Sequence, residues 1–335
     1  MEGRAVTDAR DGVYSILGMA KDIDPAHWGV DYDKEAINVF LDTTENIIRA
    51  TGRLDIICHS NWSDEHEHGC SWVLGFAGGF GECGREVFLT NSLTISEILL
   101  QNEGTMSEII TDISPYSASG STKADVLFDR QARKLIAKGV IIDKVTKEEE
   151  ALAFKSSNEA VSSAESQRVI NFETFWRVTV ANKNQVELEL DELNIDPDDL
   201  SDFDDIFDHS ESLFTLYREP APEEWGKDCE EWLKGDLTGP DATTADFLKG
   251  LGAYVRSKRY IIMKNSMGLG PEATKEGGIV CTLLGCSIPV ILRLSKTSPG
   301  EYHLAGEAYV HGLMDGEVME KLDAGHCELQ ELAII

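Results

Sequence analysis

The sequence predicts an α+β protein in which a mainly helical N-terminal region packs with a small C-terminal antiparallel β meander or barrel. Apolar residues recur at helical spacing through much of the first 185 residues, and short β-rich runs follow residue 255. An acidic segment lies between the two patterns. A chain of 335 residues also exceeds the usual size of one hydrophobic core. We therefore divide the chain into a helical region (1–185), an acidic insertion or linker (186–245) and a β-rich region (246–335).

The helical prediction rests on the spacing of apolar residues in three stretches. In residues 13–57, the pattern is formed by Val13, Ile16, Leu17, Ala36, Val39, Phe40, Ile47 and Ile48. Gly52 is placed to end a helix, since glycine takes the left-handed cap conformation without strain. Residues 58–92 are loop-like, and 93–160 return to helical spacing with Ile95, Ile98, Leu99, Val126, Leu127, Leu135 and Ile136 facing inward. A compact aromatic helix face follows, made of Phe172, Phe175, Trp176 and Val178.

The middle and the end of the chain have different patterns. Between Glu187 and Glu211 there are 12 acidic residues and no lysine or arginine, which is typical of a solvated, loosely ordered surface segment. The segment lacks the glycine that a calcium-binding EF-hand loop requires, so calcium is not expected. The β-rich runs, separated by Gly, Pro and Ser, are Tyr260–Met263, Ile279–Leu284, Ile288–Leu294 and Tyr302–Val310.

The charge and the hydropathy exclude several classes of partner. The formal net charge is −30, so nucleic acid and anionic membranes would be repelled. No apolar run reaches the roughly 18 residues needed to cross a bilayer, and the N-terminus lacks the pattern of a signal peptide. Seven scattered cysteines are typical of reduced thiols in a cytoplasmic protein. We expect a cytoplasmic protein whose oligomeric state the sequence leaves open.

Two motifs suggest a metal or a nucleotide, and neither has the required spacing. Zinc prefers sulfur and imidazole ligands, but the cluster of Cys58, His59, His66, His68 and Cys70 contains no standard pair of ligand spacings. The glycine-rich run 75–84 contains no Gly-Lys-Ser/Thr. We therefore predict no metal and no cofactor.

Two ordered series of residues carry a family resemblance. The first is Thr7-Asp-Ala-Arg-Asp-Gly-Val-Tyr-Ser-Ile-Leu-Gly18, followed by Val30-Asp-Tyr32 and 51–57. The second runs from Lys258-Arg-Tyr260 through 268–271 and 284–293 to 306–317. Together they resemble the C-terminal part of fungal heterokaryon-incompatibility (HET) proteins. The resemblance implies a chain that begins after the N-terminal HET domain, a Toll/interleukin-receptor-like domain to which the family's cell-death activity is attributed.

The chain departs from the family pattern at two places. Ser71-Trp72-Val73 matches a tryptophan-bearing turn, but the Pro-Asp-Trp that usually follows is replaced by Leu74-Gly75-Phe76. A polar corner has become apolar, which suggests a reshaped pocket wall. The second departure is Gly277-Gly278, where relatives usually carry Gly-Asp.

Polar residues gather in the terminal β motif, namely Arg293, Glu307, Tyr309, His311, Asp315 and Glu317. In a continuous strand, alternation would place Glu307, Tyr309 and His311 on one face. A purely structural interpretation, with Arg293 ion-paired to a carboxylate, stays open beside a catalytic one. No Ser/His/Asp or Cys/His triad can be assigned from the sequence.

Two functions follow as hypotheses. The first is a cofactor-free cyclase or pericyclase of fungal secondary metabolism, of Diels–Alder type, because such chemistry needs mainly an apolar cavity and one or two hydrogen-bond donors. Its catalytic residues would be Tyr309, His311 and Arg293, and an apolar small-molecule substrate would contact Trp72, Phe76, Glu307 and Met314. The alternative is a non-enzymatic regulatory or allorecognition protein, in which the acidic segment would be a docking surface.

Overall fold

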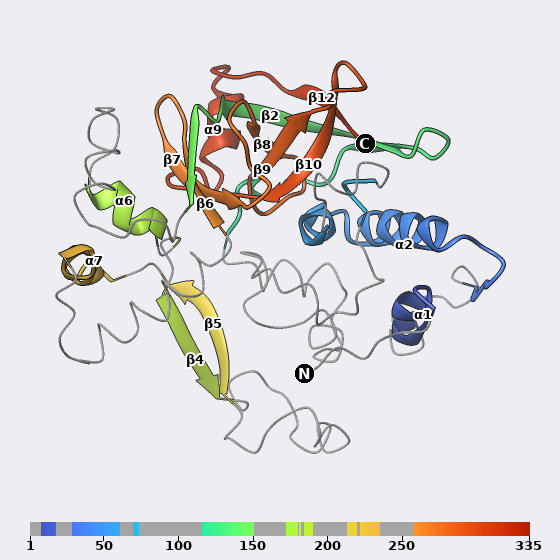
Figure 1. Cartoon of the computed structure of the whole chain (residues 1–335), viewed down its shortest axis with the longest axis horizontal. Helices are drawn as coiled ribbons and strands as arrows, with labels where there is room; N and C mark the ends of the chain where they lie inside the picture. The colour runs from blue at the N-terminus through green and yellow to red at the C-terminus, as the bar shows by residue number, and fades with distance from the viewer. Residues whose placement is uncertain are drawn as a thin grey trace.

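The computed structural model describes residues 8–17, 29–60, 70–73, 116–150, 172–179, 181, 184–189, 213–219, 222–234 and 258–335. Its centre is a closed five-stranded β-barrel (Figure 1). Going around the barrel, the strands are β2 (Lys134–Lys144), β12 (Gln330–Ile334), β10 (Glu301–Glu307), β9 (Val290–Leu294) and β8 (Ile279–Leu283). Pairing of β8 with β2 closes the ring. Strand β1 (Val126–Asp129) extends the sheet as a hairpin with β2.

A second sheet lies against the barrel. Its order is β11 (Tyr309–Val310), β7 (Met267–Pro271), β6 (Lys258–Ile262) and β3 (Lys147–Glu150), with each pair antiparallel. Gly268 allows the closest approach in this sheet, because a Cβ at that position would lie 2.1 Å from the backbone oxygen of Tyr309. A separate antiparallel hairpin is formed by β4 (Asn184–Glu189) and β5 (Leu213–Glu219).

The helices surround the barrel. Helices α1 (Asp11–Leu17) and α2 (Ala36–Thr51) and the 3-10 helix η1 (Asp55–His59) form one group, in which η1 contacts both α2 and β10. Helix α6 (Phe172–Thr179) packs on β7 and on α7 (Trp225–Lys234), and α9 (Glu317–Asp323) contacts β2. Figure 1 shows α2 and α6 at opposite ends of the view, with the barrel between them. No helix in the described part of the chain is long and apolar enough to span a membrane.

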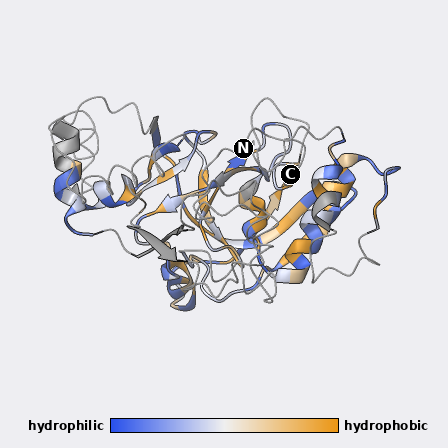
Figure 2. Cartoon of the chain, turned by 90° about the horizontal axis from the view of Figure 1, so that it is seen from below, coloured by the Kyte–Doolittle hydropathy of each residue, from blue (hydrophilic) through white to orange (hydrophobic). Residues whose placement is uncertain are grey.

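Strand β8 of the barrel is buried on both of its faces. In β8 every residue is buried, and alternate side chains belong to two different clusters. Cys281 packs in the larger cluster, which includes residues of α2, η1 and α6, whereas Val280 packs in a smaller cluster with Val318 of α9. Figure 2 shows hydrophobic residues in the central strands and both hydrophobic and hydrophilic residues on the helices. The barrel is thus packed on both sides at β8, whereas the end of β9 and the start of β12 are exposed.

Several sequence predictions are confirmed. The four β-rich runs overlap β6, β8, β9, β10 and β11, and the aromatic helix is α6. Helix α2 buries Val39, Phe40 and Ile48 and ends at Gly52, which has φ 66°. The structure does not describe residues 95, 98 and 99, nor the side chains of Ile16 and Leu17.

Other expectations are wrong. Residues 126–144, predicted as helix, form β1 and β2, and Leu127 is 67% exposed. The barrel is not purely C-terminal or antiparallel, because β2 contributes one wall and β10 runs parallel to β12. Residues 187–189 of the acidic segment belong to β4, whose backbone pairs with β5, and 190–211 lie outside the described residues. The three-part domain division stays a prediction.

Candidate functional site

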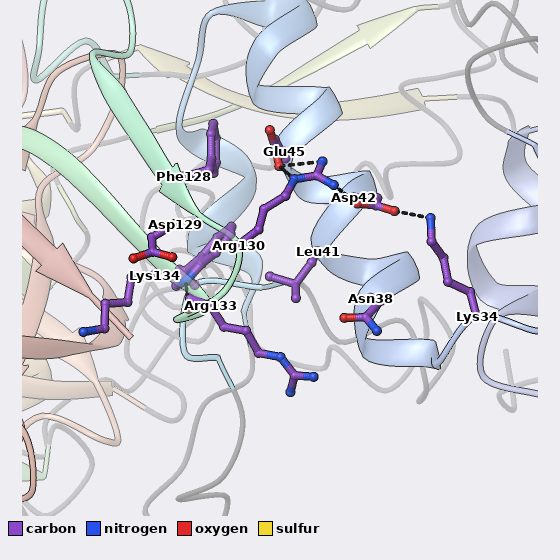
Figure 3. A pocket seen from close by; sticks show the side chains of 11 residues that line it. Lys34, Asn38, Leu41, Asp42, Glu45, Phe128, Asp129, Arg130, Arg133 and Lys134 are labelled. Carbon is purple, nitrogen blue, oxygen red and sulfur yellow. Dashed lines mark hydrogen bonds and ion pairs between the residues drawn. The ribbon is translucent and has the colours of Figure 1, made fainter.

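A cleft opens between helix α2 and the hairpin of β1 and β2 (Figure 3). Its volume is about 210 Å³. Its lining residues come from the segment before α2, from α2, from the Trp72 corner and from the hairpin: Lys34, Asn38, Leu41, Asp42, Glu45, Trp72, Phe128, Asp129, Arg130, Arg133 and Lys134. Seven of these eleven residues are charged, and polar and apolar atoms share the surface of the cleft about evenly.

An ionic network joins the two sides of the cleft. The Arg130 guanidinium lies 2.9 Å from Asp42 Oδ1 and 2.8 Å from Glu45 Oε2, and Nε also donates to Glu45 Oε2 at 2.8 Å. Arg49, one turn along α2, binds the other oxygen of Glu45 at 2.8 Å. Lys34 pairs with Asp42 at the rim (Figure 3). Two arginines therefore share the buried Glu45 carboxylate, which holds the hairpin against the helix.

Trp72 forms the base of the cleft. Its side chain is buried, its Nε1 donates to the Arg133 carbonyl at 3.2 Å, and its ring lies 5.9 Å from that of Phe128. The corner is fixed by Ser71, whose N donates to the Ile335 carbonyl at 3.0 Å and whose Oγ accepts from Leu304 N at 2.8 Å. Trp72 therefore lines a cleft, whereas Phe76 lies outside the described residues.

The structure brings Tyr309 and His311 together at a second place. The Tyr309 hydroxyl and His311 Nδ1 lie 3.0 Å apart and share a hydrogen bond, and the Tyr116 ring lies 5.9 Å from the Tyr309 ring. Burial raises the pKa of the Tyr309 hydroxyl, which stays protonated. Burial, and then the positive charge of Arg177, lower the pKa of His311. The pair is therefore a protonated phenol beside a neutral imidazole at neutral pH.

Glu307 does not share a strand face with this pair. The predicted continuous strand breaks at Ala308, whose N donates to the Pro289 carbonyl at 2.7 Å, so Glu307 ends β10 in the barrel while Tyr309 begins β11 in the second sheet. Glu307 lies 3.4 Å from Lys258 Nζ, with both side chains 4% exposed. The prediction of a common face was wrong because the chain changes sheets between the two residues.

The remaining predicted residues also lie apart from the cleft. Met314 is buried, and its sulfur accepts from Val310 N at 3.3 Å. Arg293 on β9 faces His303 in the ladder, and its Nη1 lies 3.5 Å from the Ala273 carbonyl. None of Tyr309, His311, Arg293, Glu307 and Met314 lines the cleft at Trp72. In the described part of the chain, the predicted residues therefore do not line one common cavity. Their roles toward a substrate stay predictions.

The cysteines of the histidine-rich segment also have separate contacts. Cys70 Sγ lies 3.6 Å from the Arg133 carbonyl, whereas Cys58 Sγ lies 3.7 Å from Cys286 Sγ. Over the described residues, no three His, Cys, Asp or Glu side chains are grouped as a metal site, while His66 and His68 lie outside them.

Sequence reasoning missed the ionic network. One signal was present: Asp42 and Glu45 are three residues apart and so share a helix face. The other partner in the network, Arg130, lies 85 residues after Glu45. It follows a strand that the spacing of apolar residues had led us to predict as a helix.

Comparison with known families agrees with this architecture. A family model described as "Het-6 beta-barrel domain" matches residues 154–326, slightly more than half of the chain. The chain belongs to the Het-6 β-barrel family. This Het-6 barrel match fits the predicted resemblance to the C-terminal region of HET proteins, and it includes β8, β9 and β10. Two barrel strands of this Het-6 chain, β2 and β12, lie outside the matched range. No curated protein and no solved structure matches the chain.

Proposed function

We propose that this Het-6 barrel chain is a recognition protein of the heterokaryon-incompatibility type, which binds a protein partner through its surface. The observation that carries the proposal is the charged cleft between α2 and the β1–β2 hairpin. Small-molecule pockets usually enclose about 300–1,000 Å³ and are mostly apolar. This cleft has about 210 Å³ and seven charged side chains among its eleven lining residues.

Charge complementarity is the means by which such a surface would select its partner. Arg133 is half-exposed at the hairpin, and its nearest carboxylate in the described chain, Glu35, lies 3.7 Å away and is itself 74% exposed. Both side chains are free to exchange this weak pair for one with a partner, because an exposed pair contributes little stability. Charged groups at an interface mainly determine which partner binds and how fast. We therefore place the recognition surface at the rim of the cleft.

The test uses fungal strains that differ only in this gene. The viability of cells formed by fusion is measured for strains that carry the wild type, Arg133→Glu or Lys227→Glu. Lys227 is exposed on α7 and is not part of the cleft, so its variant is a matched charge control. We expect the wild type and Lys227→Glu to lower the viability of fused cells equally, and Arg133→Glu to leave it unchanged. The three proteins should have equal unfolding temperatures. Equal viability with and without the gene would refute the proposal.

A second function, cofactor-free cyclisation of an apolar small molecule by Diels–Alder-type chemistry, is favoured by the Tyr309–His311 pair. A protonated phenol held in largely buried surroundings is suited to polarise a substrate carbonyl. In this case, deleting the gene would cause a linear precursor to accumulate in culture extracts. Tyr309→Phe would slow the product's formation by roughly ten- to a thousandfold. If strains with and without the gene gave extracts with identical metabolites, this second function would be excluded.

A further inference from the structure

Two cysteines far apart in the sequence face each other in the core. Cys58 lies in η1 and Cys286 in the turn between β8 and β9, and their sulfur atoms are 3.7 Å apart. The exposed fractions are 6% for Cys58 and 0% for Cys286. The two positions are separated by 228 residues. This contact therefore joins the N-terminal helices to the barrel.

Hydrogen bonds on both sides of Cys286 fix the turn against the start of η1. Leu54 N donates to the Gly285 carbonyl at 2.8 Å, and Ser287 N donates to Asp55 Oδ1 at 2.6 Å. Asp55 is also bound by Arg53 at 3.1 Å within the same buried junction. The two neighbours of Cys286 are thus paired with the start of η1 and the residue before it, which places Cys286 opposite Cys58 in the same short helix. A disulfide has an S–S distance of about 2.05 Å, which requires the sulfurs to approach by roughly 1.7 Å.

We propose that Cys58 and Cys286 form an intramolecular disulfide when the chain meets a hydroperoxide, and that this bond fixes η1 to the barrel. One thiol attacks the peroxide oxygen and becomes a sulfenic acid, and one water is released. The second sulfur displaces the sulfenic hydroxyl as a second water. Two thiols lose two electrons and two protons, and hydrogen peroxide is reduced to two waters.

The reaction requires a local opening of the junction. The contact with Cys286, followed by burial, raises the pKa of Cys58, and the thiolate is the reactive form. While η1 is seated, both sulfurs are therefore protected from the oxidant. Once formed, the bond closes a loop of more than two hundred residues, which restricts the unfolded chain strongly.

The experiment treats the purified chain with hydrogen peroxide and maps its disulfides by mass spectrometry without reductant. We expect one peptide linking residues 58 and 286, two hydrogens lighter than the reduced pair, which dithiothreitol separates. The unfolding temperature should rise by roughly 5–10 °C on oxidation and return on reduction. Cys58→Ala and Cys286→Ala should abolish both the peptide and the rise. Cys229→Ala, another buried cysteine in α7, should keep both.

Two outcomes would contradict the proposed disulfide. Cys58 and Cys286 alkylated as free thiols after exhaustive oxidation and unfolding would overturn the proposal. A bond between Cys281 and Cys286 in place of the proposed one would do the same. Because the wild-type chain supplies the linked peptide, the test stands even if an alanine variant fails to fold.

Discussion

At the scale of single residues, the environment of His311 favours its neutral form. The ring is half-buried beside the Tyr309 hydroxyl, and Arg177, Glu173 and Glu317 are the charged groups that act on it. Burial and Arg177 lower its pKa more than the two carboxylates raise it. The unfolded chain therefore binds a proton at this residue more readily than the folded chain does.

This pKa difference predicts a pH-dependent contribution to stability. The folded pKa is depressed, so the contribution is fully present above the unfolded value of about 6.5 and is lost as pH falls through the folded pKa. His311→Asn keeps an acceptor near the position of Nδ1 but does not titrate. We expect the variant to be less stable than the wild type at pH 7.5 and the difference to narrow at pH 5. Urea unfolding of both proteins at the two pH values measures the difference in their free energies of unfolding. A difference that is the same at both pH values would contradict the argument.

At the scale of elements, the buried Glu45 carboxylate fastens the β1–β2 hairpin to α2. Arg130 contacts it through two nitrogen atoms, although the arginine side chain is 64% exposed. A hydrogen-bonded pair with one buried partner contributes more than an exposed pair, for which about 0.2–1 kcal/mol is usual. The geometry thus makes a definite prediction about coupling.

A double-mutant cycle of Glu45→Gln and Arg130→Ala should give a coupling free energy of about 1 kcal/mol. The matched control is the pair of Lys138 and Asp125, which joins β2 to the segment before β1 and has no buried partner, since the side chains are 36% and 53% exposed. That control should couple by about 0.3 kcal/mol or less. Urea unfolding provides both values. Equal coupling in the two cycles would show that the Glu45 network does not hold the hairpin.

The second sheet provides a steric prediction. Gly268→Ala would place a Cβ 2.1 Å from the Tyr309 oxygen, so β11 must move from β7. We expect a loss of about 2–3 kcal/mol in the free energy of unfolding. Gly29→Ala is the control, since its Cβ would meet nothing within 4 Å, and it should change stability by about 0.5 kcal/mol or less. A Gly268→Ala protein as stable as the control would refute the close approach.

The elements also show what the sequence can reveal. The C-terminal strands were predictable because Gly, Pro and Ser separate short β-rich runs. Strand β2 was not, since apolar residues lie on both of its faces: Leu135 and Ala137 pack in one cluster and Val140 in the other. Without polar alternation, its apolar residues also match helical spacing.

The sites were less predictable than the fold. The hydrogen bond of Tyr309 and His311 joins residues two apart in the chain, so their nearness in the sequence was enough to suggest the pair, although β11 ends at Val310 and His311 lies in the following turn. Trp72 meets Arg133, and Cys58 meets Cys286, only in the folded chain, and their separations of 61 and 228 residues leave no local pattern. Long-range pairs of this kind follow from the tertiary fold.

At the scale of the whole molecule, the charge balance opposes folding. The chain carries 60 acidic and 30 basic residues, and a compact state brings the 30 excess negative charges closer together. The described ion pairs, such as Lys258 with Glu307, neutralise only some of the carboxylates. Mutual repulsion of the remainder is long-range, and the Debye length falls from about 30 Å at 0.01 M salt to about 10 Å at 0.1 M.

Salt should therefore stabilise this protein. Raising NaCl from about 0.01 M to 0.2 M is expected to add about 1–2 kcal/mol, or roughly 3–6 °C in unfolding temperature. The exposed ion pairs of the α2 cleft should contribute less to stability as salt rises, because salt weakens attraction as well as repulsion. Repulsion prevails because acidic residues outnumber basic ones two to one. Calorimetry in NaCl and in choline chloride measures the effect. Equal rises identify screening, whereas a fall would show that the ion pairs outweigh the net charge.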